Sequence, residues 1–101
     1  MDIKIAYIRA LDSVYQELKV EKEKINDGQD SLWTLDALMN VVQPEIKQLL
    51  VFAGKGEVYY KYGSNHRKLE SAYFLEESPN ELSQTDLGRS ILELQDIYLS
   101  I

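Results

Sequence analysis

The chain has 101 residues, of which 45% are hydrophobic and 28% are charged, with a net charge of −6 at pH 7 and no cysteine. This length predicts one small domain over residues 1–101, and the composition is that of a globular protein and not of a disordered chain. The lack of cysteine excludes a disulfide framework, thiolate-bound zinc, an iron–sulfur cluster and a thiol nucleophile.

The first predicted element is a helix over about 3–26. Its apolar residues Tyr7, Leu11, Val14 and Leu18 recur at steps of three and four, which is the period of one helix face. Asp2 is positioned to cap its start. The run Asn26-Asp27-Gly28 has the turn chemistry that ends helices, with Gly28 free to adopt a left-handed conformation.

The second predicted element is helical from about residue 31 to residue 53, with Asp30 or Ser31 as its cap. The apolar stripe keeps its phase across Pro44, which favours one kinked helix. An interior proline removes a hydrogen bond at a cost of roughly 3 kcal/mol or more, which favours two helices with Pro44 at the start of the second. The sequence leaves both alternatives open, and glycines at 54 and 56 end the segment.

Residues 57–75 are ambiguous between strand and helix. The stretch EVYYKYG and the later pair Tyr73-Phe74 are rich in strand-favouring residues, and a GSN run at 63–65 interrupts any helix. A helix from residue 64 or 65 would also place residues 66–68, all basic or histidine, in its first turn, against the helix dipole. We therefore predict a hairpin with strands at about 57–62 and 68–75, and hence an α+β fold of three main helices with a tyrosine-rich β-hairpin. The alternative is an all-α four-helix bundle.

The final predicted helix covers about 84–99 and follows a loop or single turn at 76–82. Ser83 and Asp86 have the spacing of a capping box, and Leu82 and Leu87 occupy the positions of a hydrophobic staple. Gly88, near the start of this helix, is expected to weaken it by about 1 kcal/mol.

The negative charge is concentrated at one end of the sequence. Residues 1–69 hold ten acidic and ten basic residues, whereas residues 70–101 hold seven acidic residues and a single base, Arg89. Nucleic acids and anionic membranes favour lysine and arginine, so we expect neither as a partner, and a basic protein is the better candidate. The simplest interpretation of the acidic third is a solvated surface that helps solubility.

Known catalytic and metal-binding patterns are missing from the sequence. The single histidine, His66, lies in the predicted turn, where nothing indicates a general base held in place. Glu93 and Asp96 share a helix face, but a magnesium site needs further carboxylates opposite them, and none is indicated. We therefore predict a protein that is not an enzyme and needs no cofactor.

The N-terminal sequence sets an expectation for location. It lacks the pattern of a signal peptide, and no apolar run approaches the ~18 residues that span a bilayer. We therefore expect a cytoplasmic protein.

The remaining features favour a non-catalytic protein-binding module. Tyrosine is enriched in interfaces, and the acidic third would attract a basic partner, as in an immunity-type inhibitor that masks a toxin or nuclease. A homo-oligomeric structural or regulatory protein is the alternative, and a carboxylate-metal enzyme is a third hypothesis. The predicted binding residues are Tyr59, Tyr60, Lys61, Tyr62, Glu70, Glu76, Glu77 and Glu81.

Overall fold

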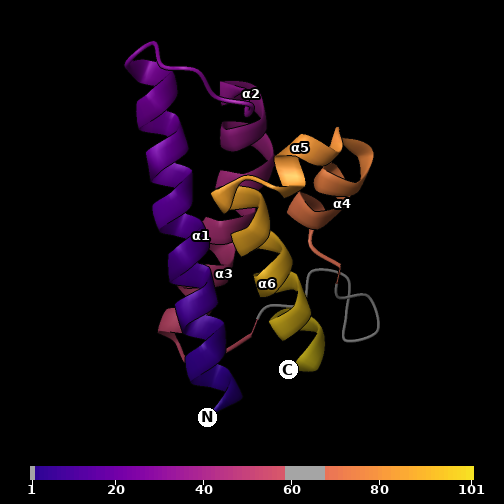
Figure 1. Ribbon diagram of the computed structural model, residues 1–101. Helices are drawn as coiled ribbons and strands as arrows, with labels where there is room; N and C mark the ends of the chain where they lie inside the picture. The colour runs from indigo at the N-terminus through magenta and orange to yellow at the C-terminus, as the bar shows by residue number, and fades with distance from the viewer. Residues whose placement is uncertain (1, 59–67) are drawn as a thin grey trace.

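The computed structural model describes residues 2–58 and 68–101, and every regular element within these two ranges is a helix (Figure 1). In chain order the elements are α1 (Ile3–Asn26), α2 (Leu35–Ala37), the π-helical segment η1 (Leu38–Val42), α3 (Gln43–Gly54), α4 (Glu70–Glu77), α5 (Asn80–Ser83) and α6 (Asp86–Ser100). The α+β prediction is therefore wrong. The all-helical alternative is closer, but α4 has 8 residues against 24 in α1, unlike the similar helices of a four-helix bundle.

Helix α1 has the bounds that its sequence predicted. The Asp2 carboxylate accepts a hydrogen bond from the Lys4 amide at 2.9 Å and so caps the first turn. At the other end Gly28 has φ +74°, and the Gln29 amide bonds the carbonyl of Lys24 at 2.8 Å. This closure satisfies a carbonyl that the helix end would otherwise leave open.

Elements α2, η1 and α3 form one continuous helical run, which decides how Pro44 is accommodated. In η1 the Gln43 amide donates to the Leu38 carbonyl, five residues back instead of four. Such a π-turn widens the backbone and makes room for a proline ring that would clash in a regular α-helix. Pro44 then stands at the start of α3, so the interruption predicted from proline takes the form of a π segment.

The cap of this helical run differs from the prediction. Thr34 precedes α2, and its hydroxyl accepts the Ala37 amide at 3.1 Å. Neither Asp30 nor Ser31 caps the run, because both precede it by several residues. The segment between α1 and α2 is thus a longer loop than the sequence predicted.

The predicted hairpin is wrong because its second strand is the helix α4. Ser71, Ala72 and Leu75 point into the core at helical spacing, and Leu69 just before them is also buried. The first predicted strand, at 57–62, falls largely outside the described residues. Within the described residues no β-strand is present for it to pair with.

A side chain from α3 explains why α4 forms against its dipole signals. The Glu45 carboxylate accepts hydrogen bonds from the amides of Glu70 and Ser71, at 2.7 and 3.0 Å, and from the Ser71 hydroxyl at 2.7 Å. Leu69, at the cap position, provides no capping side chain of its own. The N-terminus of α4 therefore contacts a negative charge 25 residues away in the sequence. The prediction from residues 57–75 alone could not take this contact into account.

The helices pack around one core. Helices α1 and α6 run antiparallel, with both chain ends at the same end of the molecule, and α6 lies between α1 and α4 (Figure 1). The rings of Tyr7 and Tyr98 stack at 6.3 Å between centroids where the two helices begin and end. The most deeply buried side chains are Leu11, Leu18, Leu38, Ile46, Leu87, Ile91, Leu94, Val14, Val42 and Ser71.

The corner between α5 and α6 begins with a different cap from the one predicted. Thr85 is the N-cap of α6, and its hydroxyl accepts the Gly88 amide at 3.0 Å while donating to the Leu82 carbonyl at 2.7 Å. Ser83 instead ends α5, so the predicted capping box is wrong. Gly88 is required here, since a Cβ at this position would lie 2.0 Å from the Leu82 carbonyl oxygen.

Candidate functional site

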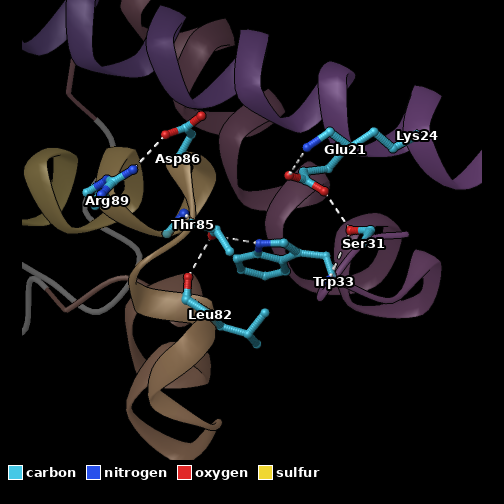
Figure 2. Close-up of polar contacts among 9 residues, drawn as sticks. Glu21, Lys24, Ser31, Trp33, Leu82, Thr85, Asp86 and Arg89 are labelled. Carbon is cyan, nitrogen blue, oxygen red and sulfur yellow. Dashed lines mark hydrogen bonds and ion pairs between the residues drawn. The ribbon is translucent and has the colours of Figure 1, made fainter. Parts of the chain in front are cut away.

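An open polar groove lies between the C-terminal half of α1, the loop before α2 and the start of α6. Its empty volume is about 600 Å³. The lining residues are Glu21, Lys24, Asp30, Ser31, Leu32, Gln84, Thr85, Asp86 and Arg89. Figure 2 shows the polar contacts of this region, in which side chains from α1, the loop and α6 converge. The residues come from three parts of the chain, so no local motif marks the groove.

A buried carboxylate forms the α1 side of the groove. Glu21 is only 5% exposed, and its Oε2 accepts a hydrogen bond of 2.6 Å from the Ser31 hydroxyl. The same hydroxyl accepts the Trp33 amide at 3.1 Å, so Ser31 ties the loop to α1. The other oxygen, Oε1, lies 3.4 Å from Nζ of Lys24, which is a long contact for an ion pair.

Trp33 connects the groove to the C-terminal helices. Its ring is 3% exposed, and its indole nitrogen donates to the Thr85 hydroxyl at 3.0 Å (Figure 2). Its ring also stacks on Phe74 of α4, with 5.9 Å between centroids. Trp33 therefore holds α4 and α6 against the loop, and the hydroxyl of Thr85 has no remaining capacity to donate to a ligand.

The outer rim of the groove carries an exposed ion pair. Nη2 of Arg89 donates to Oδ1 of Asp86 at 2.7 Å, and the two side chains are 63% and 71% exposed. Pairs this exposed contribute little stability, because water and salt screen them. The rim is therefore the replaceable part of the groove, in contrast to the buried Glu21.

The four acidic residues predicted to bind a partner do not form one cluster. Glu70 lies at the first turn of α4, and Glu76 and Glu77 lie at its last turn. Glu76 forms an ion pair with Lys68. Glu77 and Glu81, on α4 and α5, are both exposed. The structure thus separates Glu70 from Glu76 and Glu77 by most of the length of α4, about 10 Å at 1.5 Å per residue.

Two further carboxylates lie on α6. Glu93 and Asp96 are both exposed on its outer side. Among the residues that the structure describes, no group of three or more histidine, cysteine or acidic side chains is arranged to hold a metal ion. The structure therefore adds no support to the carboxylate-metal hypothesis.

The tyrosine-rich part of the predicted interface is not described. Tyr59, Tyr60, Lys61 and Tyr62 fall outside the described residues, as does His66, so their roles stay predictions. The exposed tyrosine that is described, Tyr73 on α4, has Nζ of Lys68 4.6 Å from its ring centroid.

The capping carboxylate on α3 has a shifted pKa. Burial raises the pKa of Glu45 above its ordinary value of 4.5, and the hydrogen bonds from Ser71 and Glu70 only partly oppose this effect. The hydrogen bonds of Glu45 all join α3 to the start of α4, which is a structural role. Its sequence neighbourhood, just after a proline, gives no signal of this contact.

Comparison of the chain with protein-family models, with curated proteins and with solved structures yields no match. None of the described helices combines the length and the apolar character that crossing a membrane requires. The arguments for function therefore rest on the chain's own surface and contacts.

Proposed function

We propose that this protein is a non-catalytic binding module whose acidic surface docks a basic protein. The observation that carries the proposal is the charge of that surface. Glu77, Glu81, Glu93 and Asp96 are exposed on α4, α5 and α6, and no described cation lies within ion-pair distance of any of them. A basic partner would provide the missing counter-charges.

The contrast with α1 supports this assignment. That helix carries acidic and basic residues in nearly equal number, which leaves little net charge. Uncompensated like charges repel one another in the free protein, and they attract a basic partner over about 10 Å at moderate salt. The acidic surface therefore favours rapid, salt-dependent association more than any catalytic role.

The concrete form of the proposal is an inhibitor of the immunity type, which masks a basic toxin or nuclease. A small acidic domain suits this task, because it covers a basic active-site surface and competes with the substrate's own negative charge. Its binding requires neither cofactor nor chemistry.

The test uses two variants with equal net charge. Glu77→Lys/Glu81→Lys/Glu93→Lys reverses three charges of the acidic surface, and Asp12→Lys/Glu23→Lys/Asp27→Lys reverses three exposed charges at α1; each triple change brings the net charge from −6 to zero. Partners are recovered from a lysate of the source cells with the tagged protein, purified, and titrated calorimetrically at low and high salt.

A basic partner should bind, with an affinity that falls as salt rises. The triple change on the acidic surface should lower the affinity for the partner roughly tenfold or more. The triple change at α1 should lower it roughly twofold or less. If the affinity for the partner changes neither with salt nor in the first triple variant, the proposal is contradicted. A stable dimer in light scattering, with no other partner, favours the homo-oligomer instead.

A further inference from the structure

We propose that the polar groove between α1 and α6 receives an arginine side chain, with the carboxylates of Glu21 and Asp86 as its receptors. The inference rests on the proposed function, because the arginine would come from the basic partner. It assigns to the groove a role separate from that of the exposed acidic surface on α4–α6.

The buried carboxylate is the first argument. A carboxylate offers about four acceptor positions, and a buried one is costly unless hydrogen bonds or a cation compensate it. Glu21 is 5% exposed, yet its contacts are the Ser31 hydroxyl on one oxygen and Lys24, at 3.4 Å, on the other. Its remaining acceptor capacity lies beside the groove that it lines.

The internal ion pair on the rim is the second argument. Arg89 already places a guanidinium on Asp86, at 2.7 Å from Nη2 to Oδ1 (Figure 2). This contact shows that the rim accepts the proposed chemical group. Both partners are more than 60% exposed, so an incoming guanidinium replaces Arg89 at little cost.

The remaining lining favours arginine over lysine. Planar guanidinium has five donors in a fork, which suits two carboxylates on opposite sides of a groove better than a single ammonium point charge does. Leu32 lines the groove with 62% of its surface exposed and offers apolar contact to the aliphatic stem of the side chain. The hydroxyls of Ser31 and Thr85 are engaged internally, so the carboxylates carry the recognition.

The test is a titration of the full chain with a defined probe, followed by amide shifts in NMR at constant ionic strength. The probe is N-acetyl-arginine amide, and its matched control is N-acetyl-citrulline amide, which has nearly the same shape without the charge. The arginine probe should shift amides near residues 21–24, 30–33 and 84–89, and the citrulline probe should not. Equal responses to both probes, or shifts spread over all acidic residues, overturn the proposal.

Three substitutions then locate the contacts. Glu21→Gln and Asp86→Asn should each lower the affinity for the arginine probe roughly fivefold. Glu93→Gln makes the same charge change outside the groove and should lower it roughly twofold or less. Asp86 is exposed, so Asp86→Asn stays informative if Glu21→Gln affects folding. Unchanged affinity in Asp86→Asn overturns the proposed receptor pair.

A further substitution is expected to strengthen binding. Arg89→Gln removes the internal guanidinium and should strengthen binding of the arginine probe, because Asp86 becomes free. Arg9→Gln makes the same charge change on exposed α1 and should not reproduce that gain. If both arginine variants behave alike, the effect is one of net charge and the proposed replacement is wrong.

The outcomes separate this inference from the proposed function. Probe binding that responds to groove substitutions supports the groove even if no basic partner is found. The affinity for a basic partner could instead fall with the charge reversals on α4–α6 and stay unchanged in Glu21→Gln and Asp86→Asn. That result supports the proposed function and overturns the groove inference.

Discussion

Helix α1 begins and ends by signals within or next to its own 24 residues, whereas the starts of α4 and α6 are bonded by side chains far away in the sequence. Asp2 caps α1 from the adjacent position, and Gly28 closes it. By contrast, α4 is capped by Glu45, and the cap of α6 is bonded by Trp33, 52 residues away. The C-terminal third should therefore respond strongly to changes at a few distant contacts.

Gly88→Ala should have the largest effect on stability. The added Cβ would lie 2.0 Å from the Leu82 carbonyl oxygen, and backbone atoms cannot move aside as a flexible side chain does. We expect a loss of about 3 kcal/mol or more in the free energy of unfolding, measured by urea denaturation. Gly54→Ala is the matched control, since its Cβ meets nothing within 4 Å and should be neutral or slightly stabilising. Equal effects of the two changes would contradict the close approach.

Thr85→Val should have the next largest effect. It removes the cap of α6 and leaves the buried indole N–H of Trp33 without its acceptor, for a loss of about 2–3 kcal/mol. Thr85→Ser keeps the hydroxyl and should lose less than about 1 kcal/mol, because only a methyl group is removed. The same urea measurement checks both, and a Ser variant as unstable as the Val variant would show that the hydroxyl is not responsible.

Glu45→Ala tests the distant cap of α4 against the local cap of α1. The change removes the acceptor of two amides and one hydroxyl and should cost about 2 kcal/mol, whereas Asp2→Ala should cost about 1 kcal/mol or less. Hydrogen exchange should show faster opening of the amides of α4 in the first variant while those of α1 stay protected. Uniform loss of protection over both helices would contradict the distinction between the two regions.

The smallest effect is a dependence on pH that only the distant cap provides. Because burial raises the pKa of Glu45 above 4.5, the folded protein holds this proton more tightly than the unfolded chain does. The stability that this tighter proton binding adds is therefore full below pH 4.5 and is lost as the pH rises through the folded-state pKa, whereas the hydrogen bonds to α4 remain. Relative to Glu45→Gln, the wild-type protein should lose stability from acid toward neutral pH. A difference between the two proteins that does not change with pH would contradict the raised pKa.

The predictions from sequence were right for the ends of α1 and wrong for the starts of α4 and α6, for the same reason. The bounds of α1 were right, because its cap, stripe and closing glycine are adjacent in the chain. The hairpin was wrong, because the charge that caps α4 belongs to Glu45, and no local reading of residues 57–75 includes it. Ser83 was predicted as the cap of α6 from its spacing to Asp86 and from the staple positions of Leu82 and Leu87. The contact of Trp33 with Thr85, the observed cap, exists only in the folded protein.

The binding role of the predicted site residues stays a prediction, but the exposure of two of them is seen in the structure. The exposed acids Glu77 and Glu81 follow from composition, since charge asymmetry is visible in the sequence. The polar groove was missed, because Glu21 reads as one of many charged residues on a solvated helix face. Only folding brings the loop before α2 and the start of α6 beside α1, which leaves Glu21 as a buried carboxylate at the edge of a groove.

The position of Trp33 makes the protein its own optical reporter. It is the single tryptophan of the chain, it bonds α6 through its indole nitrogen, and it stacks on α4. Its fluorescence emission should therefore shift to the red when the C-terminal helices leave the loop and water reaches the ring. Partial opening of the C-terminal third can then be followed without a label, separately from the total helix content that circular dichroism records.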